Sequence, residues 1–545
     1  MDKLSQHRKT SCAAAVGSIF VLAAVTLIAH LPHAAGGFIW DDNYHLTENL
    51  WMRSPDGLRA IWLQPGATPQ YYPLVFTTYW LGFRIWGLDP FGYHLLNIVL
   101  HVVNTLLIWQ LLRRLEVRGA WLAAAIFGIH PVHVESVAWI TELRNVLYTM
   151  FYLLSLVCYL RFHALKEIGS RASSTWGAYG SSLILFLCGL LTKSTTCTLP
   201  VIVLLILWWM QKLRRTAHVY PLIPFFLSGL LMGFVTIWVE RVFLGTQGAD
   251  WSFSFLERLL IAGRSLCFYL SKLLWPANLA FIYPKWHVDP SQWWQYLFPA
   301  AVIGLVVGAW AARHKLGKGP LAAILFFILT IAPALGFINF YGTRFAFVTD
   351  HHQYVPSIGV IALGASMITS FSFTPARKYV TAGVILLLWI TLTRLTWQRS
   401  YIFQDAVRLY EDTISKNPTS WLAYHNLAHE LTKQGEHEKA LHCQLEALRI
   451  KPDLVKTRVN MAYTLRTLGK RSEAKQEYER ALTLESDNVR ALNGLGTLLI
   501  EEGKFEEAQA LFLDALAPDS DDLETISNLK RVRNILAHLS RPAGV

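Results

Sequence analysis

Charged residues are scarce in this chain. They make up 16% of its 545 residues, whereas 53% are hydrophobic, a balance that water-soluble multidomain proteins rarely reach. Cysteine is scarce too. None of the six cysteines forms a CxxC pair and most lie in apolar stretches, so the sequence indicates neither a disulfide scaffold nor a zinc site. The composition therefore favours an integral membrane protein.

Acidic residues are especially few before the last quarter of the chain. Residues 1–397 contain 29 of the 49 Lys and Arg but only 15 of the 37 Asp and Glu, so the excess of positive charge lies in the apolar part. Cations that flank apolar spans are topology signals. Nucleic-acid binding therefore loses its main support.

Long intervals without Asp, Glu, Lys or Arg mark the predicted membrane spans, because a spanning helix needs about 20 mostly apolar residues. Eleven such intervals stand out: 10–40, 90–112, 119–134, 145–160, 172–192, 194–211, 216–239, 290–312, 319–343, 351–376 and 379–393. Since ten intervals follow the first, we expect the first to be an uncleaved anchor rather than a signal peptide.

A cytoplasmic N-terminus makes every short cytoplasmic connection basic, as the positive-inside rule requires. These connections carry Arg113/Arg114/Arg118, Arg161/Lys166/Arg171, Lys212/Arg214/Arg215, Arg313/Lys315/Lys318 and Arg377/Lys378. The pattern holds only if two further apolar stretches, Tyr72–Leu88 and Glu257–Trp275, lie in the interface instead of crossing. It places the C-terminal tail and several long connections outside, so we expect chemistry on the non-cytoplasmic side.

The tail from Trp421 repeats with a period of 34 residues. Three sets of small residues recur in register: Gly435, Gly469 and Gly503; Ala440, Ala474 and Ala508; Ala447, Ala481 and Ala515. This is the tetratricopeptide pattern, so we expect an all-α solenoid over 421–545 after a partial repeat over 398–420. Asn426 and Asn460, one period apart, are candidates to bind an extended peptide in its groove; alternatively they are solvated helix residues.

Two adjacent carboxylates, Asp41 and Asp42, follow the first predicted span. Such a pair suits a general base with a partner, or a divalent cation, and one charge raises the pKa of the other. A helix N-cap or an interfacial stop signal is the plainer interpretation.

Further outer-side candidates are imidazoles and cations. His130, His133 and Glu135 suit metal binding, but Pro131 breaks the helical register between the histidines, which favours structural hydrogen bonds or phosphate contact. The cations Arg144, Lys193 and Arg344, with His351 and His352 beside Asp350, suit a lipid phosphate, although each can also snorkel to the membrane surface.

An ordered set of motifs covers nearly the whole chain. It resembles the transmembrane-and-tetratricopeptide protein O-mannosyltransferases and their bacterial relatives, within the C-type glycosyltransferase superfold. The motifs are Asp41-Asp42, Tyr72-Pro73-Leu74, FGYHLLNIVLHVVN (91–104), HPVHVESVAWITELRNVL (130–147), TKSTTCTLP (192–200), LLWPANLAFIYP (273–284) and TDHHQYVPSIG (349–359), followed by the repeats.

The resemblance implies a polyprenyl-phosphate-linked sugar donor, often mannose, and transfer to a protein Ser or Thr hydroxyl. It implies Asp41 as the base with Asp42 as its neighbour, and donor contacts from Lys193 and His351. The chain departs from the family at Ser194, where an acidic residue or proline commonly follows the lysine, and in the stretch HHQY. A bacterial relative is expected in the inner membrane.

Two points stay open at this level. A leaving phosphate can be neutralised by arginine and lysine or by a divalent cation such as Mg or Mn, and the residues do not choose between them. The main rival function is a non-catalytic membrane anchor that displays the repeats as a scaffold for envelope assembly. A flippase is disfavoured because the charges stay at the span ends.

Overall fold

The computed structural model describes residues 2–213, 219–371, 375–518 and 521–539; the predicted inward cations Arg214 and Arg215 lie outside these ranges. Within them every regular element is a helix, which confirms the all-α prediction. The chain divides into two compact units, Met1–Leu409 and Tyr410–Val545, at a point inside the predicted connector 398–420.

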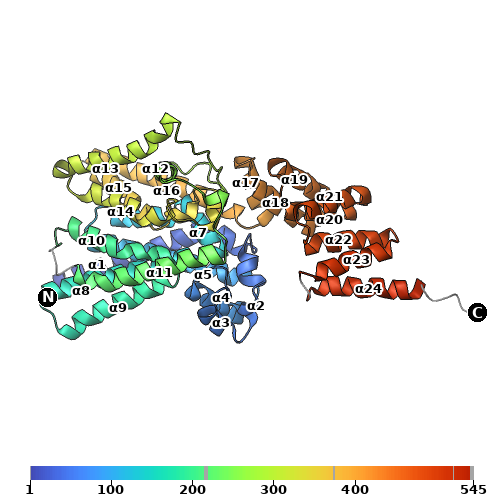
Figure 1. The fold of residues 1–545 in the computed structure, drawn as a ribbon. Helices are drawn as coiled ribbons and strands as arrows, with labels where there is room; N and C mark the ends of the chain where they lie inside the picture. Colours follow the sequence, from blue (N-terminus) through green and yellow to red (C-terminus); the bar gives the residue numbers. More distant parts are fainter. Residues whose placement is uncertain (1, 214–218, 372–374, 519–520, 540–545) are drawn as a thin grey trace, which may run out of the picture. The chain divides into compact units, whose positions relative to one another are not determined.

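The first unit is a bundle of long apolar helices, several of which run side by side (Figure 1). Its helices are α1 (Asp2–His30), α5 (Pro90–Arg114), α6 (Ala120–Gly128), α7 (Val134–Ala138), α8 (Leu143–Glu167), α9 (Ala172–Leu190), α10 (Leu199–Trp209), α11 (Ile223–Val242), α12 (Phe255–Leu274), α13 (Leu297–Leu316), α14 (Gly319–Ile331), α15 (Ser357–Ser370) and α16 (Pro375–Ile402), with the small helices α2 (Leu50–Arg53), α3 (Gly57–Leu63) and α4 (Pro73–Trp86) after the first span.

Six described helical segments are long and apolar enough to cross a membrane, in agreement with a multi-pass membrane protein. They are 15–35, 90–114, 140–167, 220–242, 293–316 and 378–402, and a bent pair over 120–138 makes a seventh if it counts as one span. All eleven predicted intervals contain helix, but 194–211, 319–343 and 351–376 contain only short apolar helices. The count of eleven therefore stays a prediction.

Two helices that we predicted to lie in the interface, α4 and α12, are not among these candidate spans. Helix α12 begins with a capping box. The Ser254 hydroxyl accepts a hydrogen bond from the Glu257 N–H, and the Glu257 carboxylate accepts one from the Ser254 N–H. Such a box satisfies two orphan N–H groups and fixes where the helix begins. One face of α12 is buried, while Arg264 and Lys272 lie on its accessible side.

The chain breaks after α6, where Pro131 prevents the helix from continuing. The helical segments Ala120–Gly128 and Pro131–Ala138 meet at an angle of 51°. Gly128 ends α6 against α1: a Cβ there would lie 2.3 Å from Thr26 Oγ1, so only glycine permits this approach.

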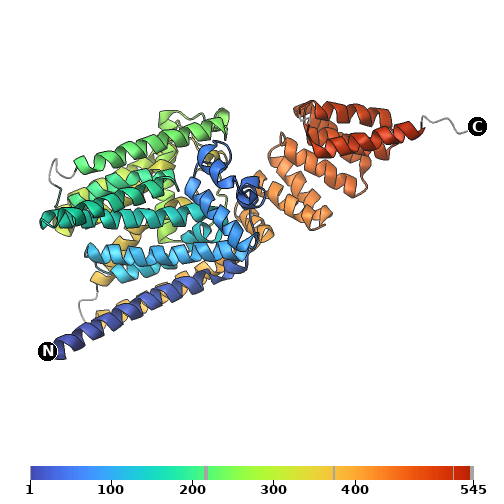
Figure 2. The ribbon, with the colours of Figure 1, turned by 90° about the horizontal axis from the view of Figure 1, so that it is seen from below.

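The last helix of the unit, α16, packs along α1 (Figure 2). Thr396 Oγ1 donates a hydrogen bond of 2.6 Å to the carbonyl of Ile129. At the end of α16 the Gly37 N–H donates to the carbonyl of Gln404 at 3.0 Å, and the Gln404 amide bonds the carbonyl of Pro32. The segment that leads from α1 to Asp41 is thus held by α16.

The second unit is a solenoid of helix pairs, as predicted. After α17 (Ala406–Lys416), the helices of the solenoid are α18 (Trp421–Lys433), α19 (His437–Ile450), α20 (Val455–Thr467), α21 (Arg471–Leu484), α22 (Val489–Glu501), α23 (Phe505–Leu516) and α24 (Leu523–Leu539). The six periodic alanines are fully buried where paired helices touch. Gly435, Gly469 and Gly503 each have a φ near +80°, the left-handed conformation that favours glycine at the turn.

Candidate functional site

Asp42 is buried, and its carboxylate connects two segments of the chain through hydrogen bonds. Its Oδ1 accepts hydrogen bonds from the Thr141 N–H at 2.8 Å and from Thr141 Oγ1 at 2.6 Å, and its Oδ2 accepts from the Ile39 N–H at 2.9 Å. Burial raises the pKa of Asp42 to about 7, while these three donors oppose that shift by stabilising the carboxylate. The contacts fix the segment after α1 against the start of α8.

Asp41 precedes Asp42, and one of its carboxylate oxygens has no hydrogen-bond partner among the described residues. Oδ1 is buried and accepts no hydrogen bond from the described residues, and Oδ2 lies 3.7 Å from His45 Nδ1. The side chain as a whole keeps 27% of its surface exposed. Burial raises the pKa of Asp41, and the nearby His45 and Arg144 partly offset the rise. A partly exposed carboxylate with a raised pKa can accept a proton.

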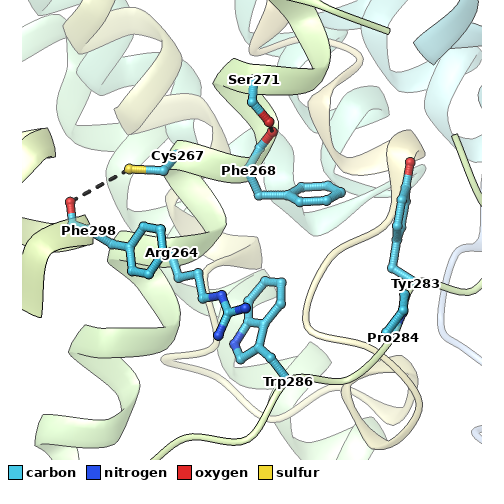
Figure 3. Close-up of a pocket in the computed structure, with 8 residues that line it drawn as sticks. All are labelled: Arg264, Cys267, Phe268, Ser271, Tyr283, Pro284, Trp286 and Phe298. Carbon is cyan, nitrogen blue, oxygen red and sulfur yellow. Dashed lines mark hydrogen bonds between the residues drawn. The ribbon is translucent and has the colours of Figure 1, made fainter. Parts of the chain in front are cut away.

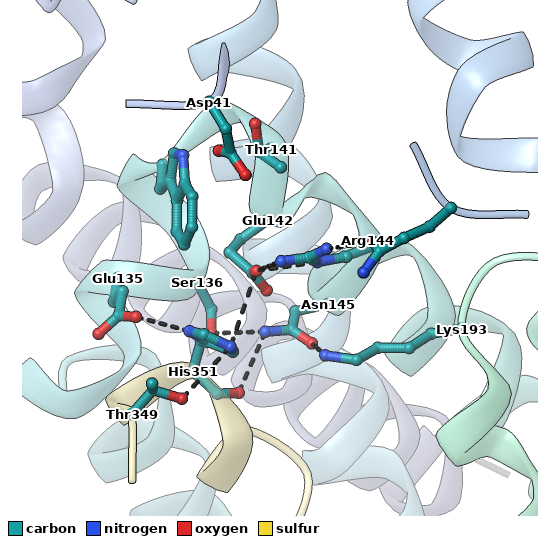
Figure 4. Close-up of polar contacts among 12 residues, drawn as sticks. Asp41, Glu135, Ser136, Thr141, Glu142, Arg144, Asn145, Lys193, Thr349 and His351 are labelled. Atoms are coloured by element: carbon teal, nitrogen blue, oxygen red, sulfur yellow. Dashed lines mark hydrogen bonds and ion pairs between the residues drawn. The ribbon is translucent and has the colours of Figure 1, made fainter. Parts of the chain in front are cut away.

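Arg144 is a cation that acts on the Asp41 carboxylate, and it is itself paired with Glu142. Its Nε donates to Glu142 Oε1 at 2.8 Å, a second guanidinium nitrogen bonds the same oxygen, and its Nη1 donates to Gln70 Oε1 at 2.8 Å. Figure 4 shows this pair beneath Asp41. Because Glu142 is fully buried, Arg144 is the charge that compensates it.

Asn145 joins two further predicted site residues, Lys193 and His351. Lys193 Nζ donates to Asn145 Oδ1 at 2.5 Å, and the Asn145 amide donates to the carbonyl of His351 at 3.0 Å (Figure 4). His351 Nδ1 lies 2.6 Å from Glu135 Oε1. Desolvation lowers the pKa of Lys193 to about 8, and Glu142 opposes that shift. We name the set Asp41, Glu135, Glu142, Arg144, Asn145, Lys193 and His351 the polar network.

Three predicted site residues have other contacts. His130 Nε2 lies 3.1 Å from the carbonyl of Leu273, and His133 lies between the carbonyl of Phe127 and Ser357 Oγ, so the two imidazoles have separate structural partners. Arg344 forms an ion pair of 2.8 Å with Asp250. Of the three predicted outer cations, Arg144 and Lys193 therefore lie in the polar network with His351, while Arg344 has its own acidic partner.

In the second unit, Asn426 and Asn460 occupy equivalent positions on α18 and α20, the first helices of successive repeats. Both side chains are half-buried. The periodic placement is as predicted, and their binding of a peptide stays a prediction.

The sequence interpretation missed Thr141, Glu142 and Asn145, which connect the predicted residues. All three lie in the stretch TELRN at the start of α8. The signal was an acidic residue two positions before an outer arginine in an otherwise apolar region, because a buried carboxylate requires a nearby cation.

Family models match both units. Residues 67–238 match the dolichyl-phosphate-mannose-protein mannosyltransferase model, and residues 409–442 and 465–532 match tetratricopeptide repeat models. The first range includes Glu142, Arg144 and Lys193 and begins after Asp41.

Curated relatives that match this chain are named as protein O-mannosyl-transferases. Protein O-mannosyl-transferase F38B6.6 of Caenorhabditis elegans is 23% identical over 80% of this chain and 63% of its own length. TMTC1 of Homo sapiens is 25% identical over 83% and 57%, and Tmtc2 of Drosophila melanogaster is 31% identical over 32% and 20%. The chain thus spans less than two thirds of the length of these relatives. The resemblance to the transmembrane-and-tetratricopeptide protein O-mannosyltransferases is confirmed, and the likeness to their bacterial relatives stays a prediction.

Solved tetratricopeptide-repeat structures are similar to part of this chain. The first tetratricopeptide domain of Spaghetti (RPAP3), solved with an HSP90 peptide, covers 22% of this chain and 93% of its own, with 21% identity and a TM-score of 0.21. YrrB covers 28% and 79%, with 17% identity and a TM-score of 0.23.

Proposed function

We propose that this chain is an integral-membrane glycosyltransferase that moves a mannose-like sugar from a polyprenyl-phosphate donor to a Ser or Thr hydroxyl of a protein. The observation that carries the proposal is the partly exposed carboxylate of Asp41, whose pKa is raised by burial and which lies near the Arg144 guanidinium. The mannosyltransferase model and the O-mannosyl-transferase relatives support the same reaction class.

In the proposed reaction Asp41 takes the proton of the acceptor hydroxyl while the hydroxyl oxygen bonds to the anomeric carbon of the sugar. The bond from that carbon to the donor phosphate breaks, and the phosphate leaves with the electron pair. The configuration at the anomeric carbon inverts in one step. Asp42 contributes by position, since its three hydrogen bonds hold the segment that carries Asp41.

Negative charge develops on the leaving phosphate, and the proposal assigns its neutralisation to Arg144 and Lys193, with His351 as a further donor. A divalent cation such as Mg or Mn fits these residues less well. Among the described residues no three His, Cys, Asp or Glu side chains are grouped so that they could hold a metal ion, and both oxygens of Asp42 accept protein hydrogen bonds.

The proposed location is the bacterial inner membrane, with the polar network and the repeats on the non-cytoplasmic side. The support is the charge pattern, because one orientation makes all the short inward connections basic. The repeats would bind the acceptor protein or a partner along the face that carries Asn426 and Asn460. The alternative function is a non-catalytic scaffold. The observation in its favour is that the repeats form a compact unit of their own.

The test is a transfer assay with the full chain in proteoliposomes, supplied with polyprenyl-phosphate mannose and Ser/Thr-rich peptides. Wild type and a Glu48→Gln control should transfer sugar, whereas Asp41→Asn should not; Glu48 is an exposed carboxylate seven residues further along. Absence of transfer by the wild type across mannose, glucose and galactose donors, together with loss of partner capture on disruption of the repeats near Gly469, would favour the scaffold.

A further inference from the structure

A second site lies outside the polar network, in a pocket of about 540 Å³ beside α12 (Figure 3). Four rings and one cation dominate its lining, and no acidic side chain contributes to it. We name it the aromatic pocket; it is lined by Arg264, Cys267, Phe268, Ser271, Tyr283, Pro284, Trp286 and Phe298. Its volume lies within the range of small-molecule sites.

Arg264 supplies the charge of the aromatic pocket. Its guanidinium carbon lies 4.5 Å from the ring centroid of Trp286 and 5.5 Å from that of Phe298. These cation–π contacts place the guanidinium, but they do not use its five N–H groups, and among the described residues it has no carboxylate or carbonyl partner. A guanidinium fixed in this way is ready to donate to an anion, and its planar fork suits a phosphate.

Trp286 adds a second unused donor. Its indole Nε1 is buried and has no acceptor among the described residues. A buried N–H without an acceptor costs free energy, and such a group calls for a partner that the protein itself does not supply. The two donors without protein acceptors therefore belong to neighbouring side chains of one pocket.

The position of the pocket indicates what kind of anion it meets. Phe298 lies at the start of the candidate span 293–316, where Trp293, Trp294 and Tyr296 are exposed. Exposed tryptophan and tyrosine at a span end are typical of the membrane–water interface. Leu274 and Leu297, which are close in sequence to the lining residues Ser271 and Phe298, are also exposed. The phosphate group of a lipid lies at the membrane–water interface, because the apolar chain of the lipid stays in the membrane. A lipid phosphate is therefore the kind of anion that this pocket would meet.

We propose that the aromatic pocket binds the phosphate of a membrane amphiphile, with Arg264 and the Trp286 N–H on the phosphate and the rings against the first carbons of the apolar chain. The ligand chemistry is shared by a polyprenyl phosphate and by an anionic phospholipid. The inference concerns binding and does not rest on the proposed sugar transfer, so the two can fail separately. Tyr283 Oη donates to Asp350 Oδ1 at 2.9 Å, which connects one wall of the pocket to the segment of His351.

Cys267 offers a reporter inside the pocket. The residue is half-buried, and its thiol donates a weak hydrogen bond to the carbonyl of Phe298 at 3.6 Å. In the wild type trypsin releases it in the peptide 265–272, so maleimide labelling of this one cysteine can be followed by mass spectrometry. The full chain would be labelled in neutral phosphatidylcholine nanodiscs, and then in discs that also contain polyprenyl phosphate, polyprenol or phosphatidylglycerol, or with inorganic phosphate in the buffer.

A phosphate lipid should slow the labelling of Cys267, whereas polyprenol should not. Arg264→Gln should weaken this protection about 10- to 100-fold, the expected effect of losing a charge-assisted hydrogen bond. The matched control is Arg313→Gln, which removes a guanidinium stacked on Trp310 at the far end of α13. Protection by polyprenyl phosphate alone would identify the donor lipid, and equal protection by phosphatidylglycerol would identify a general lipid site.

Three results would overturn the proposal. They are protection by polyprenol equal to that by polyprenyl phosphate, protection by inorganic phosphate alone at equal concentration, and no protection by either phosphate lipid. The comparison of polyprenol with its phosphate uses the wild type, so it decides the matter even if Arg264→Gln fails to fold.

Discussion

Replacing each of the two adjacent aspartates by asparagine should separate chemistry from folding. Asp41→Asn keeps the shape of the side chain but removes proton acceptance, so the rate of transfer should fall about 100- to 10,000-fold, which is about 2.7 to 5.4 kcal/mol of barrier. Stability should change by less than about 0.5 kcal/mol, because Asp41 Oδ1 accepts no hydrogen bond that would be lost.

Asp42→Asn should give the opposite result. Its carboxylate accepts from two N–H groups and one hydroxyl, and an amide that offers one oxygen leaves at least one buried donor facing its NH₂ group. We expect a loss of about 1 to 3 kcal/mol in the free energy of unfolding. Any loss of activity of this variant should be proportional to the fraction of protein that is unfolded.

The assay pairs initial rates of transfer in proteoliposomes with thermal unfolding of the same preparations, and Glu48→Gln serves as the exposed control. The decisive comparison is activity per folded molecule. If well-folded Asp41→Asn transfers sugar at the wild-type rate, Asp41 is not the base. If both variants lose stability and activity in parallel, the pair has a structural role only.

Three further predictions follow from the same contacts. Because burial raises the pKa of Asp41, kcat/KM should fall as the pH drops through a value above the ordinary range of a carboxyl; an acidic limb centred near 4 would contradict this assignment. Arg144→Gln should weaken use of the donor by about 1.5 to 3 kcal/mol and should also destabilise the fold by unpairing Glu142; the double variant with Glu142→Gln should restore folding but not donor affinity, and unchanged donor dependence would remove Arg144 from the site. Cys443, buried in the repeats, should react with a membrane-impermeant thiol reagent after mild denaturation of intact cells, and labelling that requires a broken membrane would reverse the proposed orientation.

Local patterns in the sequence were enough to predict the apolar helices and the solenoid. The repeat signal consists of small residues at fixed spacing, and Ala440, Ala474 and Ala508 are buried because helix pairs touch at these positions. Membrane helices of intermediate length were harder to judge. Whether a short helix such as α10 or α14 crosses depends on how its neighbours cover it, which composition does not report.

The candidate site could be predicted only in part. Asp41, Arg144 and Lys193 stand out because charges are rare beside apolar spans. Their partners do not stand out, since Thr141 meets Asp42 across 99 positions of sequence and Asn145 meets Lys193 across 48. Arg344 was grouped with the other cations by its side of the membrane, but its actual neighbour is Asp250. Contacts between distant segments depend on the packing of the whole bundle.

The hydrogen bonds of Gln404, just after α16, give the segment before Asp41 a mechanical link to the rest of the chain. Gln404 holds the backbone of Pro32 and Gly37 only a few positions before Asp41, and the second unit begins at Tyr410, a few positions after Gln404. A pull along the chain from the repeats would act on this anchor before it could reach the core of the bundle. Under the function proposed above, a captured partner that pulls on the repeats would strain the segment before Asp41, and the rate of transfer would then depend on force as well as on concentration.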